Sequence, residues 1–266
     1  MAFSYEELAE IRHYIHQHPE LSGQEYQTTA FLKERLEELG IRILESGLKT
    51  GLIAEIGSGQ PVVALRADID ALPILEQTNL PYQSQNPGVM HACGHDFHQT
   101  SLLGAAALLK EKEDQLEGTV RLIFQPAEEI SEGASDVLAT GLLEDVQGII
   151  GFHNIPQLKA GQLALNAGAM MAGVEKFKVT VTGVSSHAAR PDLGVDTVTA
   201  VTTMVQNVQL LISRTVSPFE TAVLSITHLD VGSTWNVLPK SGYFEGTIRS
   251  FNPSVQRDLK AHFISI

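Results

Sequence analysis

The segment from Met90 to His98, with the sequence MHACGHDFH, concentrates side chains that bind metal ions. It holds three histidines, an aspartate and the only cysteine of the chain. Thiolate, imidazole and carboxylate groups together suit zinc and other first-row divalent ions. In an extended segment Cys93 and His95 would point to the same side, which fits two ligands of one metal site. A lone buried cysteine is more often an inert hydrophobic residue, but the flanking histidines and aspartate, with Gly94 allowing close approach, favour the metal site.

A pair of adjacent carboxylates, Glu128 and Glu129, follows the apolar residues 122–124. Two carboxylates that are both buried and ionised repel each other, so this pair needs a cation or a raised pKa. With a metal ion present, one carboxylate would bind the ion. Its neighbour would take a proton from the attacking water as general base, a division of labour suited to hydrolysis. The alternative is that the pair begins a solvated loop, and the pair by itself does not separate the two interpretations.

Other polar side chains are candidates to support the metal ligands. A ligating histidine commonly donates its second ring N–H to a carboxylate or a backbone carbonyl. Asp68 and Asp70 follow an apolar strand candidate, while His91 and Asp96 lie in the cysteine segment. We expect these residues in supporting positions, with Arg66 paired to one of the first two.

The remaining histidines give weaker signals. His153 stands before Asn154 at the end of an apolar strand candidate, and by itself it indicates little. Four more are interpreted as surface or hydrogen-bonded structural histidines: His16, His18, His98 and His228.

The elements that must position these residues alternate between helix and strand in the first part of the chain. Apolar spacings of three and four predict helices at 4–18 and 28–40, the first with a Ser4–Glu7 capping box. Short apolar runs predict strands, and the small-residue block 99–116 predicts a further helix. Helices interleaved with apolar strands predict an α/β fold, a layered catalytic domain with helices on both faces of a mixed sheet.

Four polar clusters fall where those strands should end, at 66–73, 90–98, 125–129 and 151–154. In an open α/β sheet, ligands bind in the crevice beyond the carboxyl ends of the strands. We therefore expect the four clusters to converge there.

The pattern changes near residue 168. Residues 174–183 begin with apolar and polar side chains in alternation, which predicts a strand with one solvated face. A long helix at 196–214, two further alternating strands and the start of another helix follow. The order βαββα predicts a smaller α+β module at 170–266, with the catalytic metal-binding domain at 1–169.

Charge and composition narrow the class of partner. The 266 residues carry 18 lysines and arginines against 31 aspartates and glutamates, a net charge of −13. An acidic surface disfavours nucleic acid and anionic membranes as partners. One cysteine cannot form an intramolecular disulfide, and the first residues lack the basic and apolar regions of a signal peptide. We expect a soluble, cytoplasmic protein.

Six ordered motifs resemble a known family. They read LRADIDALP, NPGVMHACGHDFH, FQPAEE, GFHN, GVSSHAARP and NVLPKSGYFEGTIRSF. In this order they resemble the metal-dependent amidohydrolases that include hippurate hydrolase, bacterial N-acyl-amino-acid amidohydrolases and plant auxin-conjugate hydrolases, relatives of aminoacylase and glutamate carboxypeptidase. The resemblance runs from the first helix to residue 266.

The resemblance implies a set of roles in the first domain. Two divalent ions per subunit (Mn, Zn, Co or Ni) would be held by Cys93, His95, Glu129 and His153, with the Cys93 thiolate able to bridge them. Glu128 would be the general base.

In the second domain, the resemblance implies a dimerisation and lid role. His187 and Asn236 would meet the substrate or its developing oxyanion, in the family from the partner subunit of a homodimer. Arg249 is the candidate to bind the substrate carboxylate. The implied substrate is a small-molecule N-acyl amino acid, cleaved at its amide bond.

The resemblance also implies one further metal-ligating histidine beyond residue 266. His262 lies within the last predicted helix and is not expected to replace it. We therefore expect little hydrolase activity from this chain by itself. The alternative is a non-catalytic dimerising or metal-binding fragment, and comparing this chain with one extended past the further histidine would separate the two.

Overall fold

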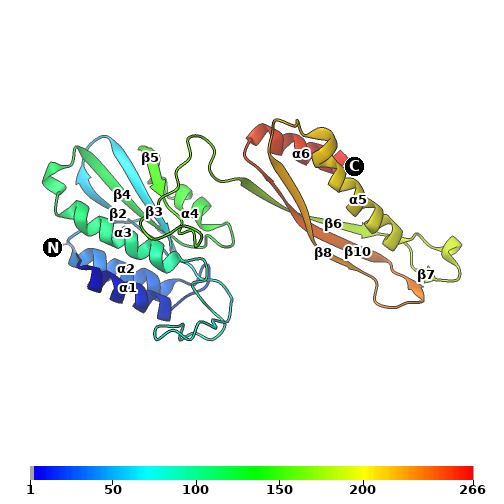
Figure 1. Cartoon of the computed structure of the whole chain (residues 1–266), viewed down its shortest axis with the longest axis horizontal. Helices are drawn as coiled ribbons and strands as arrows, with labels where there is room; N and C mark the ends of the chain where they lie inside the picture. Colours follow the sequence, from blue (N-terminus) through cyan, green and yellow to red (C-terminus); the bar gives the residue numbers. More distant parts are fainter. Residues whose placement is uncertain (1–2, 266) are drawn as a thin grey trace. The chain divides into compact units, whose positions relative to one another are not determined.

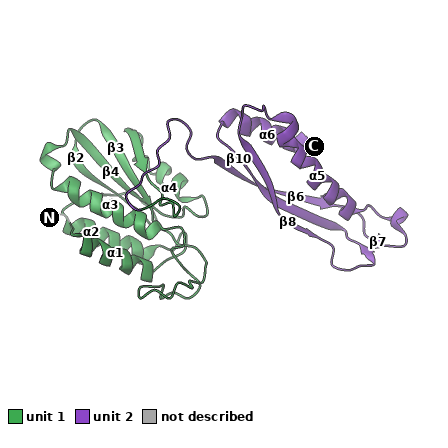
Figure 2. Cartoon of the chain, viewed as in Figure 1, with its two compact units in different colours: residues 1–159 green, residues 160–266 purple. Residues whose placement is uncertain are grey.

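The computed structural model describes residues 3–265 and forms two compact units, Met1–Lys159 and Ala160–Ile266 (Figure 2). The division falls ten residues before the boundary expected at residue 169. The elements of the first unit are, in chain order, α1 (Tyr5–Gln17), α2 (Tyr26–Glu38), β1 (Arg42–Leu44), β2 (Leu52–Ser58), β3 (Val62–Asp68), α3 (His95–Lys110), the 3₁₀ helix η1 (Glu113–Gln115), β4 (Gly118–Gln125), α4 (Gly133–Ala139) and β5 (Val146–Gly151).

The first unit is built on one mixed sheet (Figure 1). Within the described residues its strands lie in the order β1-β2-β4-β3-β5. β3 lies between β4 and β5 and is parallel to both, while β1 and β2 pair antiparallel to each other and β2 pairs antiparallel to β4. The three parallel strands therefore end at the same edge of the sheet.

Helices cover both faces of this sheet, as the alternation of strands and helices predicts. Because neighbouring side chains on a strand point to opposite faces, Ala54 of β2 packs in a cluster with Leu36 of α2 and Leu103 of α3. Ile53, one residue earlier, packs in a second cluster with Val137 of α4. Each fully buried leucine or isoleucine contributes about 1.5–3 kcal/mol relative to an exposed one, so these two clusters hold the layers together. The α/β layered fold is confirmed.

Local signals fix the ends of the first two helices. Ser4 accepts from the backbone N–H of Glu7, and the Glu7 side chain accepts from the backbone N–H of Ser4, so the predicted capping box is present. Gly40, just after α2, has a φ of +67°. Glycine adopts this left-handed conformation without a Cβ clash, so α2 stops where the sequence predicts.

The second unit is an antiparallel sheet with two helices on one face. Its three longer strands lie in the order β6-β10-β8, and the helices share a core with them that includes Val208, Leu224 and Phe244. The order β6, α5, β8, β10, α6 is the βαββα pattern expected from the sequence. The elements are β6 (Gly173–Thr182), β7 (Ser186–His187), the 3₁₀ helix η2 (Pro191–Leu193), α5 (Thr197–Thr215), β8 (Ala222–Val231), β9 (Val237–Leu238), β10 (Ser241–Ser250) and α6 (Pro253–Ser265).

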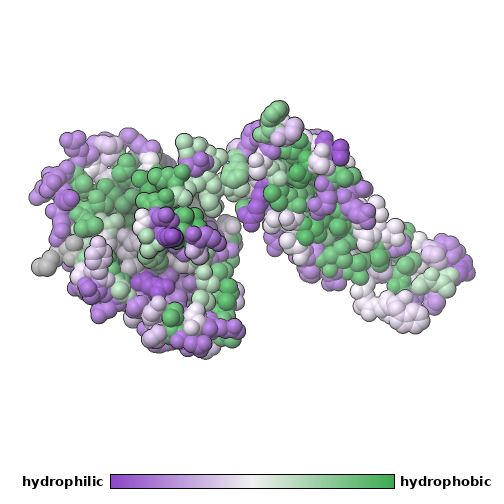
Figure 3. All heavy atoms as spheres, in the orientation of Figure 1, coloured by the Kyte–Doolittle hydropathy of each residue, from purple (hydrophilic) through white to green (hydrophobic). Residues whose placement is uncertain are grey.

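The visible surface of each unit mixes hydrophilic and hydrophobic side chains (Figure 3). On β5, the edge strand of the first sheet, Ile149 and Ile150 are 55% and 68% exposed. Among residues 3–265, no helix is both long and apolar enough to cross a membrane.

Candidate metal centre

The ends of the three parallel strands bring the predicted site residues together. Asp68 is the last residue of β3, Glu128 and Glu129 follow β4 by a short turn, and His153 follows β5. His95 is the first residue of α3, which packs against β3. These positions lie beyond the carboxyl ends of parallel strands, where α/β sheets bind ligands.

The Cys93–His95 segment reaches this site in a different way from the one expected. It is not extended, because α3 begins at His95, four residues before the helix predicted at 99–116. Gly94 is left-handed, with a φ of +88°, and a Cβ there would lie 2.3 Å from Oδ1 of Asn154. Glycine is therefore needed for the turn and for the close approach of the β5 loop.

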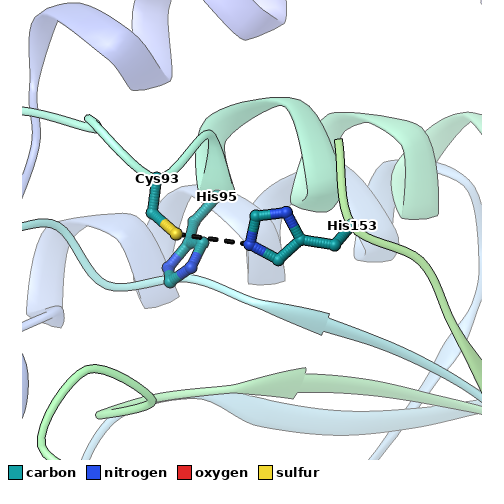
Figure 4. Close-up of side chains that lie close together, drawn as sticks. All are labelled: Cys93, His95 and His153. Atoms are coloured by element: carbon teal, nitrogen blue, oxygen red, sulfur yellow. Dashed lines mark hydrogen bonds between the residues drawn. The ribbon is translucent and has the colours of Figure 1, made fainter. Parts of the chain in front are cut away.

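The donor atoms of the expected ligands lie within a few ångströms of one another. Sγ of Cys93 is 3.3 Å from Nε2 of His153, and Figure 4 shows these side chains and the His95 ring gathered between the start of α3 and the loop after β5. Nε2 of His95 is 3.8 Å from Oε1 of Glu129 and 4.0 Å from Oε2 of Glu128. Among the described residues, three sets of three donor atoms, each set within 4.8 Å, share His95: one with Cys93 and His153, one with the two glutamates, and one with Asp68 and His98.

Both histidine rings are oriented by the nitrogen that faces away from the cluster. Nδ1 of His95 donates to the backbone oxygen of Asp70 at 2.8 Å and lies 3.2 Å from its carboxylate. Nδ1 of His153 donates to the backbone oxygen of Asn154 at 2.8 Å. These bonds keep the lone pair on Nε2 of each ring, as metal-ligating histidines require. Asp70, which the sequence suggests as a supporting residue, thus contacts the His95 ring, and its other carboxylate oxygen accepts from the backbone N–H of Glu129.

The electrostatics of the cluster favour a cation. Burial, together with the charges of Glu129, Glu128 and Asp68, raises the pKa of Cys93 to about 12. Burial and the charges of Asp68 and Glu129 also raise the pKa of Glu128. A divalent ion would reverse both effects, because a positive charge favours the ionised thiolate and carboxylate.

Two buried polar atoms show whether the side chains of this cluster suit a metal ion. Among the described residues, Nε2 of His95 and Oε1 of Glu129 are buried and have no hydrogen-bond partner. Buried polar atoms are normally paired, so these two need another partner. The atoms lie 3.8 Å apart, and an imidazole nitrogen beside a carboxylate oxygen suits a first-row divalent ion. The donor set therefore fits the metals that the sequence predicts.

The turn that carries the two glutamates depends on a residue that the sequence did not single out. Ala127 has a φ of +48°, an uncommon conformation for a non-glycine residue. Its backbone N–H donates to Oε1 of the fully buried Glu25 at 2.8 Å, and Thr50 donates to the other Glu25 oxygen. The lone Glu25 at the start of α2 gives no sequence signal, since its partners are distant along the chain.

Asp68 is buried beside His98, His95 and Arg66, which favour its ionised form. Burial would raise the pKa of Asp68, but the hydrogen bond from His98 and the charges of His95 and Arg66 outweigh it and bring the pKa to about 2. Arg66 donates to Asp68, as expected.

Within residues 3–265, Asp96 forms no hydrogen bond or ion pair with His95 or His153, although the sequence suggests a supporting role. Its carboxylate turns toward α1, where it pairs with Arg12 at 2.7 Å and with His16 at 2.8 Å. As the second residue of α3 it points to a different side from His95, so it joins two helices instead. His91 is buried nearby, and burial lowers its pKa to about 4.

The site candidates of the second unit separate into two places. β7 and β9 pair His187 with Val237, and the backbone oxygen of Asn236 accepts from Ala188 at 3.0 Å. His187 and Asn236 are thus neighbours. Arg249 is exposed near the far end of β10. At about 3.3 Å per residue it lies about 25 Å from Ser241, the end of β10 that follows β9 in the chain.

Comparison with known proteins identifies the family. The model of peptidase family M20/M25/M40 matches residues 64–242, more than half of the chain. The chain belongs to this family. The family resemblance drawn from the six motifs is confirmed.

Two curated relatives and one solved structure show the extent of the similarity. The chain is 47% identical over 98% of its length to an N-acetyl-L-cysteine deacetylase of Bacillus subtilis, and it spans 63% of that protein. It is 39% identical over 93% of its length to an N-acyl-L-amino acid amidohydrolase of Geobacillus stearothermophilus, 68% of which it covers. The crystal structure of a dinuclear metal-binding peptidase of the M20 family from Bacillus subtilis matches with a TM-score of 0.82 and 43% identity, over 96% of this chain and 67% of that one.

Proposed function

We propose that this protein hydrolyses the amide bond of N-acyl amino acids with two divalent metal ions. The observation that carries the proposal is a pair of buried atoms on His95 and Glu129 that have no hydrogen-bond partner within residues 3–265 and lie beside a thiol and a second imidazole. The similarity to an N-acetyl-L-cysteine deacetylase and an N-acyl-L-amino acid amidohydrolase supports the substrate class. The similarity to a dinuclear metal-binding peptidase supports the metal number.

Cys93, His95, Glu129 and His153 are the proposed metal ligands. When bound, the divalent ions supply Lewis acidity, which lowers the pKa of a coordinated water and polarises a carbonyl oxygen. The chain itself supplies rings that are already oriented, since the Nδ1 atoms of both histidines are engaged by backbone oxygens.

Glu128 is the proposed general base. Its side chain is 42% exposed, so it can meet a substrate, while the Glu129 side chain is only 20% exposed. Bound divalent ions would favour the ionised form of the Glu128 carboxylate. An ionised carboxylate at this position can take a proton from water and later return it to the leaving amine.

The second unit would complete substrate recognition. His187 and Asn236 form one polar pair, suited to the carbonyl oxygen of the substrate, and the exposed Arg249 is suited to its carboxylate. Arg249 lies at the end of β10 that is distant from His187 and Asn236. We therefore propose that these residues act in a homodimer, with His187 and Asn236 reaching the active site of the partner. We place the enzyme in the cytoplasm. The alternative of a non-catalytic fragment has no support among the relatives named above, which are hydrolases.

The test is a hydrolysis assay with N-acetyl and N-benzoyl amino acids in the presence of Mn²⁺, Zn²⁺, Co²⁺ or Ni²⁺. It compares the 266-residue chain with the same chain extended by the corresponding carboxyl-terminal segment of the 47% identical relative. Glu128→Gln is the matched control in each, because general-base removal typically lowers the rate by about 10²–10⁴-fold. The absence of any Glu128-dependent release of amino acid from both chains would refute the proposal.

A further inference from the structure

The third histidine of the MHACGHDFH segment has no role in the proposed chemistry, yet it is held at both ring nitrogens. His98 lies one turn after His95 on α3 and is 1% exposed. Its Nδ1 is 2.6 Å from Oδ1 of Asp68. Its Nε2 accepts the backbone N–H of Asn154 at 3.1 Å and lies 2.6 Å from the side-chain oxygen of the same residue. Whichever contact Nε2 makes, the ring joins the end of β3 to the loop after β5.

Asn154 carries this connection on to a proposed metal ligand. Its backbone N–H faces His98, and its backbone oxygen accepts from Nδ1 of His153 at 2.8 Å. Its side chain lies against Gly94, where a Cβ would leave no room. Asn154, whose backbone oxygen orients the His153 ring, is therefore held through its own backbone N–H by His98, and its side chain packs against the start of α3.

We propose that His98 is a positioning residue for the metal centre. It acts through Asn154 and holds His153 with its Nε2 toward Cys93. Asp68 accepts a hydrogen bond from Nδ1–H and so fixes the orientation of the ring. This inference rests on the proposed function in one respect, namely that His153 binds a metal ion.

Direct metal binding by His98 is the competing role, because Asp68, His95 and His98 also present donor atoms within 4.8 Å of one another. The hydrogen bonds argue against it. Both nitrogens of His98 already have protein partners, whereas Nε2 of His95 has none among the described residues. An ion bound to His98 would displace either Asp68 or Asn154.

The test is a titration of the 266-residue chain with Co²⁺, whose thiolate charge-transfer absorption reports on Cys93. Two substitutions separate the halves of the connection. His98→Gln places an amide near the position of Nε2 and keeps a partner for Asn154. His98→Asn places an amide near the position of Nδ1, keeps a partner for Asp68 and leaves Asn154 without one.

We expect His98→Asn to weaken Co²⁺ binding by about 10–100-fold, the usual effect of losing a residue that orients a metal ligand. His98→Gln should recover most of this loss. The saturated Co²⁺ spectrum of His98→Asn should match that of the parent, since the same ligands bind once enough Co²⁺ is present. A changed spectrum at saturation would instead identify His98 as a ligand and overturn the proposal.

Two further variants exclude a general loss of stability. Leu103→Ala, in the buried core of the same helix, should lower stability by about 2–5 kcal/mol and leave Co²⁺ affinity nearly unchanged. In a His153→Ala background, His98→Asn should have little further effect, because residues that act through one contact are not additive. A full additional loss in that background would overturn the connection through His153.

The Co²⁺ titration of the unsubstituted chain, the parent, distinguishes a failure of the His98 role from a failure of the proposed metal centre. If the parent binds Co²⁺ with a thiolate signal that Cys93→Ala abolishes, and His98→Asn binds as tightly as the parent, the positioning role alone is wrong. If the parent shows no Cys93-dependent signal, the proposed metal centre is wrong and the role of His98 falls with it.

Discussion

Glu128 and Glu129 are adjacent in the sequence but differ in their surroundings. Glu129 has a buried oxygen that finds no partner in the described part of the chain, and its backbone N–H donates to Asp70. The Glu128 side chain is the more exposed of the two. We predict that Glu129→Gln lowers Co²⁺ or Zn²⁺ affinity at least about 10-fold, because the amide has lost the charge that binds the ion. Glu128→Gln should keep the metal affinity of the parent and, in the chain extended past residue 266, lose turnover. Elemental analysis and isothermal titration measure the difference, and the reverse pattern would mean that the two roles are exchanged.

Cys93 offers a pH-dependent test because it is the only cysteine. Burial and the charges of Glu129 and Glu128 raise its pKa from 9.0 to about 12. At pH 8 a thiol with a pKa of about 12 has about 10³-fold less thiolate than one with a pKa of 9.0. The more basic thiolate is also the stronger nucleophile, which recovers about 30-fold of the lost reaction rate. We therefore predict that the metal-free protein reacts with iodoacetamide about 30-fold more slowly than a short cysteine peptide.

The sign of the pH effect follows from the same pKa. Because thiolate accumulates only as the pH approaches about 12, the reaction rate should still rise about tenfold per pH unit between pH 8 and 10. Glu129→Gln should speed the reaction at each pH, since it removes the charge that raises the pKa of Cys93 most. A rate that levels off near pH 9 would show an ordinary thiol and would contradict the electrostatic account of the site.

At the scale of elements, the turn between β4 and α4 is held by Glu25 at the start of α2. We predict that Glu25→Ala destabilises the protein by about 1–3 kcal/mol, because it leaves the buried N–H of Ala127 unpaired. Glu25→Gln should cost less: its amide oxygen can accept from Ala127, and the Thr50 hydroxyl can reverse to accept from its NH₂ group. Urea denaturation measures both.

The exposed Glu37 on the same helix supplies the matched control, and Glu37→Ala should change stability by less than about 0.5 kcal/mol. Metal affinity gives a second measurement. The affinity of Glu25→Ala for metal ions should fall, because Glu129 follows the turn that Glu25 holds. Equal stability of Glu25→Ala and Glu37→Ala would show that the contact with Ala127 contributes nothing.

The helices and strands show which parts of the fold and of the site could be predicted from the sequence. The Ser4–Glu7 cap, the stop at Gly40 and the alternation of β6 depend on neighbours a few residues away, so local patterns suffice for them. The ligand candidates could be found because their residue types are unusual together. The start of α3 at His95 was missed because the sequence alone did not reveal the left-handed Gly94 that begins the helix.

Long-range partners lay outside what the sequence could predict. Glu25 looks ordinary in its local sequence, and His98 is interpreted from the sequence as a structural histidine. The roles proposed for them follow only from contacts with Ala127 and Asn154, which are 102 and 56 residues away. Likewise Asp96 resembles a partner for the adjacent His95, but helical geometry turns it to α1. A motif therefore predicts which residues do chemistry better than it predicts which residues hold them in place.

At the scale of the whole molecule, the four proposed ligands lie in the first unit and the proposed substrate-binding residues in the second. The described backbone of residues 152–172 between their sheets forms turns and bends, without helix or strand. Lys159 is the one lysine or arginine in this segment, and Arg190, in an exposed loop of the second unit, precedes a proline that blocks trypsin. The sequence thus provides a site at which a protease can separate the units.

We predict that trypsin cleaves first after Lys159 and that Lys159→Gln removes this first cut. Exposed segments without regular structure are the preferred sites of proteolysis, while the sheets on either side have their own cores. The purified 1–159 fragment should bind Co²⁺ within about threefold of the affinity of the uncut chain, because Cys93, His95, Glu129 and His153 all remain in it. Mass spectrometry of the first products and a Co²⁺ titration of the fragment provide the measurements. A fragment that folds, as judged by circular dichroism, but no longer binds Co²⁺ would mean that a ligand comes from the second unit and that the ligand set proposed here is incomplete.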